Sequence, residues 1–210
     1  MRAVRRPLVK ICGVTRIEDA EAAAELGADF VGLNFWPGSN RYVDAERSAE
    51  ISAAVSGSVG VVGVFVNASI EEMLGRIAEA RLDIVQLHGD EPPDCLGQIK
   101  GPAWRAFRGL PSMEVFRLWS AAAGVLVDSR REGAYGGSGE SWDYASLRSL
   151  PRDARPLLVS GGIRPANARE ALAASGADGV DVASGVESSP GIKDREKMQR
   201  LIEEVRGART

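Results

Sequence analysis

Hydrophobic residues in this chain form short runs that recur about every 20 to 30 residues, separated by polar and small residues. Most of the runs end in a polar residue, and their last residues are Cys12, Asn34, Asn67, His88, Arg108, Asp128, Ser160 and Ala183. Parallel strands joined by crossover helices all point the same way, so their ends gather on one rim. The pattern therefore predicts an α/β fold, a single (β/α)8 barrel, with an active site on that rim.

Helix-start signals follow two of these runs. Thr15-Arg16-Ile17-Glu18 has the spacing of a capping box and predicts a helix that continues through an alanine-rich stretch to Gly27. Ser69-Ile70-Glu71-Glu72 repeats the signal. The expected strands cover residues 8–12, 29–35, 59–66, 83–88, 103–108, 124–128, 157–160 and 179–183, and the pattern is weakest in the fifth.

A doubly wound open sheet is the alternative architecture. It requires fewer strands or a division into two halves, and the GxGxxG turn is absent after the first run. No long linker rich in proline and glycine interrupts the alternation of strands and helices, so we expect residues 1–210 to form a single barrel domain.

The charge and the lengths of the apolar runs limit the kinds of molecule that this protein is expected to bind. The 210 residues carry a formal net charge of -3, and 44% are hydrophobic. The basic start Arg2, Arg5, Arg6 is too short for a nucleic-acid-binding arm. No apolar run approaches the roughly 18 residues of a membrane span, and no signal-peptide core precedes the first strand. We expect a cytoplasmic protein that binds neither nucleic acid nor membrane.

The metal-binding residue types are sparse. Cys12 and Cys95 show no disulfide or CxxC spacing, so both thiols are expected to be reduced. His88 is the only histidine, and neither HExxH nor an acidic cation loop occurs. We expect no metal and no cofactor.

Three late segments are rich in glycine: 135–139, Ser160-Gly161-Gly162, and Ser184-Gly185-Val186-Glu187. Glycine lets backbone N–H groups turn toward an anion, and the last two segments follow the seventh and eighth strands, where barrels often hold phosphate. We therefore expect a phosphorylated ligand, against the alternative of ordinary turns. The long polar stretch 129–140 is either a loop that closes over the pocket or an ordinary solvated loop.

Cys12 and Asp128 are the candidate base and acid. Strand alternation puts Lys10 on the face of Cys12, and a nearby cation favours the thiolate. Asp128 ends an apolar run, where a carboxyl group can act as general acid. The alternatives are a structural cysteine and a helix cap. Asp181 interrupts the eighth strand, so we expect an ion pair with Lys10 and an orienting role beside the substrate.

Other polar residues are candidates for substrate contacts. His88 lies across the predicted mouth from Cys12, which argues against a hydrolase-type dyad and favours a contact with substrate. Arg41, after the second strand, presents a guanidinium that binds carboxylates in a bidentate manner, unless it is a solvated surface residue. Cys95, in a proline-flanked helical region, is expected to be inert packing.

Taken together, the motifs resemble one family, the phosphoribosylanthranilate isomerases of tryptophan biosynthesis. The resemblance spans nearly the whole chain and rests on the order and spacing of Lys10-Ile11-Cys12-Gly13, Ser39-Asn40-Arg41-Tyr42-Val43, Val62-Gly63-Val64-Phe65-Val66-Asn67, Val85-Gln86-Leu87-His88-Gly89, Leu126-Val127-Asp128, Gly136-Gly137-Ser138-Gly139, Ser160-Gly161-Gly162, and Val180-Asp181-Val182-Ala183-Ser184-Gly185-Val186-Glu187.

The resemblance implies an Amadori rearrangement of N-(5-phosphoribosyl)anthranilate to the corresponding 1-deoxyribulose 5-phosphate. By analogy with the family, Asp128 is the general acid that opens the sugar ring, Cys12 is the general base, and Arg41 binds the anthranilate carboxylate. The phosphate loops match at Gly161, Gly162, Ser184 and Gly185. Glu140 departs from the pattern, because a carboxylate beside bound phosphate is unfavourable.

Two other functions remain open. The related isomerase of histidine biosynthesis performs the same rearrangement, but it resembles two half-barrel repeats with an aspartate base where Cys12 stands here. The other function is a barrel that binds a phosphate ligand without catalysis. A barrel that had lost its catalytic activity is, however, expected to lose Cys12 or Asp128 before it loses the phosphate loops. The sequence leaves open whether the protein is a monomer or a homodimer.

Overall fold

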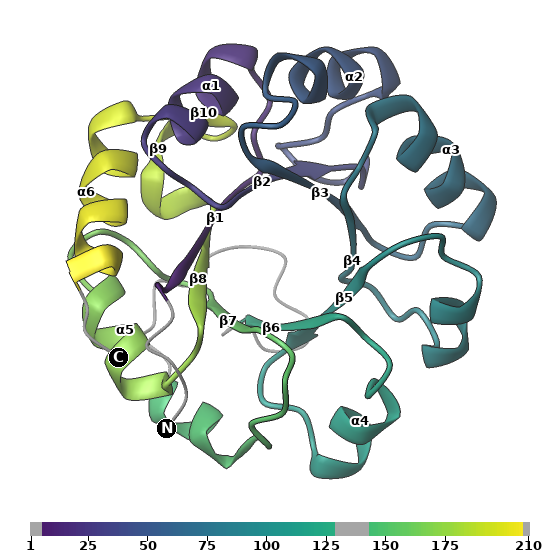
Figure 1. Cartoon of the computed structure of the whole chain (residues 1–210), viewed down its shortest axis with the longest axis vertical. Helices are drawn as coiled ribbons and strands as arrows, with labels where there is room; N and C mark the ends of the chain where they lie inside the picture. The colour runs from purple at the N-terminus through teal and green to yellow at the C-terminus, as the bar shows by residue number, and fades with distance from the viewer. Residues whose placement is uncertain (1–5, 129–142, 208–210) are drawn as a thin grey trace.

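Eight parallel strands close into a barrel in the computed structural model, which describes residues 6–128 and 143–207. Figure 1 looks down the barrel, with the strands around the centre and the helices outside them. The strands are β1 (Leu8–Cys12), β2 (Phe30–Asn34), β3 (Gly60–Phe65), β4 (Ile84–Leu87), β5 (Ala103–Arg108), β6 (Gly124–Asp128), β7 (Leu157–Ser160) and β8 (Gly179–Val182). Each pairs with the next, and β8 pairs with β1. The (β/α)8 prediction is confirmed, including the weak fifth strand.

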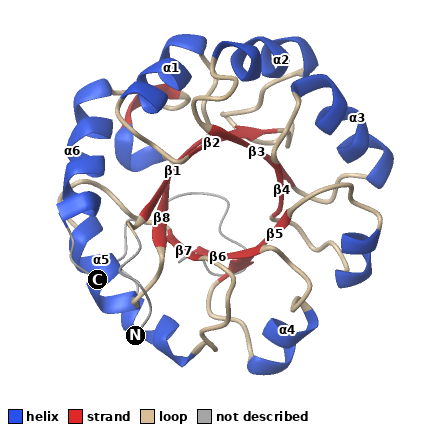
Figure 2. Cartoon of the chain, viewed as in Figure 1, coloured by secondary structure: helices blue, strands red, loops and turns tan. Residues whose placement is uncertain are grey.

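The outer ring consists of helices of uneven length (Figure 2). The α-helices are α1 (Ile17–Glu25), α2 (Ala45–Ala54), α3 (Ile70–Ala80), α4 (Met113–Leu118), α5 (Ala168–Ser175) and α6 (Arg195–Gly207). Single 3-10 turns, η1 (Pro93–Gly97) and η2 (Tyr144–Ser149), stand where helices would follow β4 and β6 in the described residues. These short connections allow a chain of 210 residues to close a fold that commonly takes about 250 residues.

The segment between β8 and α6 carries extra structure. A 3-10 turn, η3 (Ser184–Val186), leads into β9 (Glu187–Ser189) and the antiparallel β10 (Ile192–Lys193). This two-stranded hairpin lies beside the ends of β1 and β8 (Figure 1). The hairpin thereby brings Gly191 and Lys193, near the end of the chain, into contact with Thr15 and Cys12, near its beginning.

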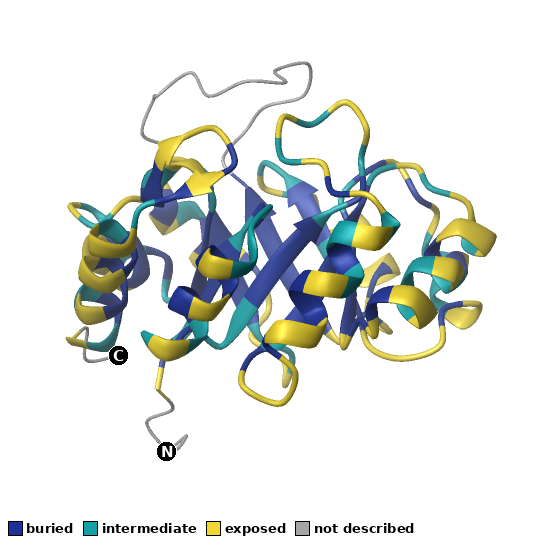
Figure 3. Cartoon of the chain, turned by 90° about the horizontal axis from the view of Figure 1, so that it is seen from above, coloured by how far each residue is buried: buried dark blue, intermediate teal, exposed yellow. Residues whose placement is uncertain are grey.

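Apolar side chains fill both faces of the sheet. Inside the barrel, one cluster consists of Val62, Ile84, Trp104, Ala106, Leu126 and Leu158. A larger cluster lies between the strands and the helices. Figure 3 shows the strands buried and the outer faces of the helices exposed. Burial of the strands on both faces explains why they appear in the sequence as continuous apolar runs.

The first capping-box prediction is wrong. Helix α1 has Arg16 at its N-cap without a side-chain cap, and the Thr15 hydroxyl instead donates to the carbonyl oxygen of Gly191 at 2.6 Å. The hairpin supplies that acceptor, and local sequence could not reveal it. The second capping-box prediction is confirmed for the bond made by the N-cap side chain, because the Ser69 hydroxyl accepts a hydrogen bond from the Glu72 backbone amide at 3.1 Å.

Two further observations concern the helical segments. Cys95 is buried in η1, as expected for a packing residue. In the described part of the chain, no helix combines the length and the apolar character needed to cross a membrane.

Candidate active site

A pocket opens at the carboxyl ends of the strands, where the sequence placed the site. It is lined by Cys12, Gly13, Asn34, Trp36, Ser39, Arg41, Val64, Val66, His88, Arg108, Asp128, Ser160, Gly161, Gly162, Ile163, Asp181, Val182, Ala183 and Ser184. Every predicted site residue is in this lining except Gly185. Residues far apart in sequence are therefore brought to one cavity because all eight strands run in the same direction.

Cys12 and Lys10 share the inner face of β1, and the neighbouring strand makes room for both. A Cβ atom added at Gly32 would lie 2.9 Å from the Cys12 sulfur and 3.1 Å from the Lys10 ammonium. A larger residue at this position of β2 would therefore displace the thiol. The predicted arrangement, with the ammonium one layer below the thiol, is present.

Lys10 is fully buried inside the barrel and pairs with Asp181, as predicted. Its Nζ donates to Asp181 Oδ1 at 2.6 Å, across the β1–β8 junction that closes the sheet. The Ser160 hydroxyl donates to Asp181 Oδ2 at 3.3 Å. The partners are necessary because an unpaired charge at this depth would be strongly destabilising.

Lys10 favours the Cys12 thiolate, as expected, but other groups outweigh it and the net pKa of the thiol is raised. Desolvation raises the pKa of the Cys12 thiol, and the carboxylate of Asp181 raises it further. Lys10 lowers that pKa by its charge and a hydrogen bond, but the net shift is upward. The sequence revealed the cation but not the burial and the anion that outweigh it.

Asp128 and His88 lie on another part of the rim. Asp128 ends β6 and is almost completely buried, and its carboxylate is near enough to raise the pKa of His88. Burial lowers that pKa more strongly, so the net shift is downward and the imidazole is neutral at pH 7. Gln86, on the inner face of β4, places its Nε2 3.3 Å from Nδ1 of His88. His88 thus presents a neutral, oriented ring to the pocket.

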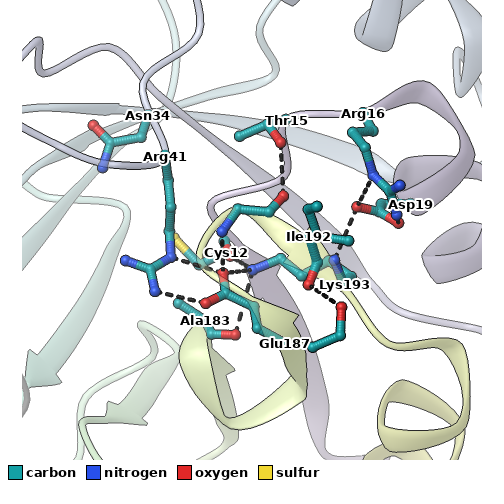
Figure 4. Close-up of polar contacts among 12 residues, drawn as sticks. Cys12, Thr15, Arg16, Asp19, Asn34, Arg41, Ala183, Glu187, Ile192 and Lys193 are labelled. Atoms are coloured by element: carbon teal, nitrogen blue, oxygen red, sulfur yellow. Dashed lines mark hydrogen bonds and ion pairs between the residues drawn. The ribbon is translucent and has the colours of Figure 1, made fainter.

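Arg41 reaches the pocket from the segment after β2, but it already has a carboxylate partner. Its Nε and Nη2 donate to the two carboxylate oxygens of Glu187 at 2.7 and 2.6 Å (Figure 4). Lys193, fully buried, also donates to Glu187 at 2.7 Å. In the sequence, Glu187 appeared only as the end of a phosphate-loop motif, and nothing marked Lys193. The hairpin that brings them here was not predicted.

The glycine loops after β7 and β8 have the backbone that the phosphate prediction requires. Gly161 and Gly162 have φ angles of +85° and +66°, which a side chain would strain. The Tyr144 hydroxyl donates to the Gly161 carbonyl at 3.1 Å and holds this turn in place. The segments 135–139 and 129–140, with Glu140, lie outside the described residues.

Gly185 is absent from the pocket lining formed by the described residues, but it touches the other phosphate loop. A Cβ atom there would collide with the carbonyl oxygen of Ile163. We expect Gly185→Ala to separate the two loops, raise KM and lower the free energy of unfolding by about 1–3 kcal/mol. Steady-state kinetics and urea unfolding check this. The matched control is Gly75→Ala, in open space on α3; equal stability and KM in both variants would contradict the prediction.

The donors for a metal site are scattered. Among the described residues, no group of three or more His, Cys, Asp or Glu side chains could hold a metal ion.

Comparison with known proteins agrees with this geometry. The family model for N-(5'phosphoribosyl)anthranilate (PRA) isomerase matches residues 9–204. The N-(5'-phosphoribosyl)anthranilate isomerase of Pseudomonas savastanoi pv. phaseolicola is 44% identical over 99% of this chain and 100% of its own length. That of Myxococcus xanthus is 42% identical over 92% and 93%.

Solved structures give the same result. The crystal structure of phosphoribosyl anthranilate isomerase from Thermotoga maritima superimposes with a TM-score of 0.85 at 36% identity, covering 96% of this chain and 99% of that one. The enzyme from Thermus thermophilus gives 0.84 at 38% identity, covering 94% and 98%. This chain belongs to the N-(5'-phosphoribosyl)anthranilate isomerase family.

Proposed function

We propose that Cys12 is the general base and Asp128 the general acid in the aldose–ketose isomerisation of N-(5'-phosphoribosyl)anthranilate, the tryptophan-biosynthesis reaction that this chain catalyses. The observation that carries the proposal is that the two residues end β1 and β6, separate strands around one pocket. An acid and a base that act on different atoms of one substrate need such a separation, whereas a nucleophile–base dyad needs direct contact.

The steps follow from these positions. Asp128 donates its proton to the ribose ring oxygen, the bond from that oxygen to C1 breaks, and the nitrogen lone pair forms an iminium with C1. Cys12, as thiolate, takes the proton from C2, and the electron pair of that C–H bond neutralises the iminium to give an enolamine. Loss of the proton from the C2 hydroxyl and protonation at C1 then produce the ketone.

The remaining pocket residues bind the two ends of the substrate in this proposal. The amides of Gly161, Gly162, Ser184 and Gly185 bind the phosphate, supported by the positive φ angles and the close contact of the two loops. Arg41 binds the anthranilate carboxylate, while His88 and Asp181 contact or orient the sugar between the two ends. A family structure contains reduced 1-(o-carboxyphenylamino)-1-deoxyribulose 5-phosphate, at 33% identity to this chain and a TM-score of 0.82.

The raised pKa of the Cys12 thiol predicts a pH dependence. A base must be deprotonated to act, and kcat/KM reports ionisation in the free enzyme. In Asp128→Asn, where the acid no longer titrates, we expect the residual kcat/KM to rise with pH between about pH 7 and 9, because the free thiol has its ordinary pKa near 8.5 and burial raises it here. A stopped-flow pH profile checks the direction. A value that stays constant or falls over this range would contradict Cys12 as the base.

The activity itself has a direct assay. Purified protein is mixed with freshly made phosphoribosylanthranilate, without metal or nicotinamide, and the loss of anthranilate fluorescence is followed. Decay well above the spontaneous rate is the expected result. A folded protein that leaves the spontaneous rate unchanged would indicate another phosphosugar substrate or a binding role.

We also propose that the protein acts in the cytoplasm as a monomer or a homodimer, with the phosphosugar as its ligand. The biosynthetic family supports the location. The Thermotoga maritima relative, 33% identical, is described as dimeric. Light scattering on the eluted protein distinguishes a mass of 22.3 kDa from twice that value.

A further inference from the structure

Glu187 holds the guanidinium of Arg41 from one side. Both carboxylate oxygens accept from Arg41, at 2.7 Å from Nε and 2.6 Å from Nη2. An arginine side chain has two edges that can bind a carboxylate with two hydrogen bonds, one formed by Nε and Nη2 and one formed by Nη1 and Nη2. Glu187 occupies the first. Figure 4 shows the remaining terminal nitrogen turned away from Glu187.

Lys193 fixes Glu187 in turn. The lysine has no exposed surface in its side chain, and its Nζ donates to Glu187 Oε1 at 2.7 Å. It also donates to the carbonyl oxygens of Cys12 at 2.6 Å and Ala183 at 3.3 Å, at the ends of β1 and β8. The carboxylate that holds Arg41 is therefore tied to the backbone of the barrel rim by a buried ammonium group.

The charges of this cluster suit an anionic ligand. Burial alone would raise the pKa of Glu187, but hydrogen bonds from Arg41 and Lys193 reverse the shift, so its pKa lies below the ordinary value and the group is a carboxylate. Among the described side chains of this cluster, Arg41 and Lys193 share the single carboxylate of Glu187, so the cluster carries a net positive charge. A substrate carboxylate that binds Arg41 would complete the charge balance.

We propose that Glu187 is a positioning residue that selects for a carboxylate on the substrate. By occupying the Nε–Nη2 edge of Arg41, it turns the Nη1–Nη2 edge toward the pocket and fixes the plane in which a carboxylate must lie. The inference rests on the carboxylate-binding role proposed for Arg41 and adds that Glu187, anchored by Lys193, determines the geometry of that contact.

The test separates binding from turnover. In Glu187→Gln the amide nitrogen cannot accept a hydrogen bond, so the two-point hold on Arg41 is lost. We expect KM to rise about tenfold with kcat within about threefold of wild type, because the variant loses binding that ground and transition states share. The inhibition constant of inorganic phosphate is expected to stay within about twofold, since the glycine loops are untouched. Glu50→Gln, which removes the exposed Arg47–Glu50 pair on α2, is the matched control with wild-type kinetics.

A double-mutant cycle distinguishes this inference from the function on which it rests. If Glu187 acts through Arg41, Glu187→Gln changes KM less than about twofold in an Arg41→Ala background. An Arg41→Ala variant with wild-type KM would refute the proposed role of Arg41 in binding the substrate carboxylate. The positioning role would be overturned if Arg41→Ala raised KM but Glu187→Gln left KM at the wild-type value. It would also be overturned if Glu187→Gln raised KM by the same factor in the Arg41→Ala background as in the wild type.

A second variant covers the case in which Glu187→Gln fails to fold, as circular dichroism would reveal. Glu187→Asp keeps the charge beside Lys193 but is one methylene too short to hold Arg41 at both nitrogens. It is expected to show the same rise in KM with little change in kcat. A folded Glu187→Asp with wild-type KM would overturn the proposal.

Discussion

Cys12→Ala is expected to lower kcat by about 10² to 10⁴-fold, the range that a positioned general base contributes. The reason is structural. The Cys12 sulfur lies over Gly32 at the end of β1, and the pairing of β1 with β2 fixes its position, so an alanine methyl group leaves no base at this point. KM is expected to change little because the phosphate and carboxylate contacts remain. Steady-state fluorescence kinetics give both parameters.

Cys95→Ala is the matched control for this variant. Cys95 is the other cysteine of the chain, buried in η1 and absent from the pocket lining formed by the described residues. It is expected to lose some stability but to keep kcat. Turnover close to wild type in Cys12→Ala, or an equal loss in both variants, would remove Cys12 from the role of base.

Asp128→Asn is expected to lower kcat by a similar factor, about 10² to 10⁴-fold. The amide has nearly the same shape but cannot deliver the proton that the departing ring oxygen needs. The site around it is otherwise unchanged, so the fold and the phosphate contacts are expected to persist. Circular dichroism and the inhibition constant of inorganic phosphate establish that the variant is folded and still binds.

The control is Asp90→Asn. Asp90 lies near the same rim, pairs with Arg108 and is 75% exposed in its side chain. Removing its charge is expected to leave kcat within about twofold, as for most exposed ion pairs. If Asp128→Asn retained turnover like that of Asp90→Asn, Asp128 would not be the acid, and another polar residue of the lining would have to supply the proton.

Strand order and the pocket were predictable because both follow from periodic patterns. Strands buried on two faces appear as apolar runs, and a polar residue that ends such a run must lie on the rim. Cys12, His88, Asp128 and Ser160 each end such a run, and all four line the pocket. The Lys10–Asp181 pair followed in the same way, since β8 must meet β1 when the sheet closes.

The failures involve contacts between segments that local sequence does not relate. Thr15 has the spacing of a capping residue, but its hydroxyl donates a hydrogen bond to the carbonyl oxygen of Gly191, which lies 176 positions later. The pKa of Cys12 depends on how much water the fold removes and on the distance to Asp181, neither of which alternation reveals. Lys193 is one charged residue among many near a surface helix, and only the hairpin shows that it is buried.

One substrate is expected to lie across the mouth, with the base and the acid at different atoms. A crystal structure of this protein with the reduced product, 1-(o-carboxyphenylamino)-1-deoxyribulose 5-phosphate, would show its position. We expect phosphate on Gly161, Gly162, Ser184 and Gly185, the carboxylate on the Nη1–Nη2 edge of Arg41, and C2 about 3.5 Å from the Cys12 sulfur, within reach of reaction. A ligand bound with its phosphate away from these loops, or with C2 beyond the reach of Cys12, would contradict this arrangement.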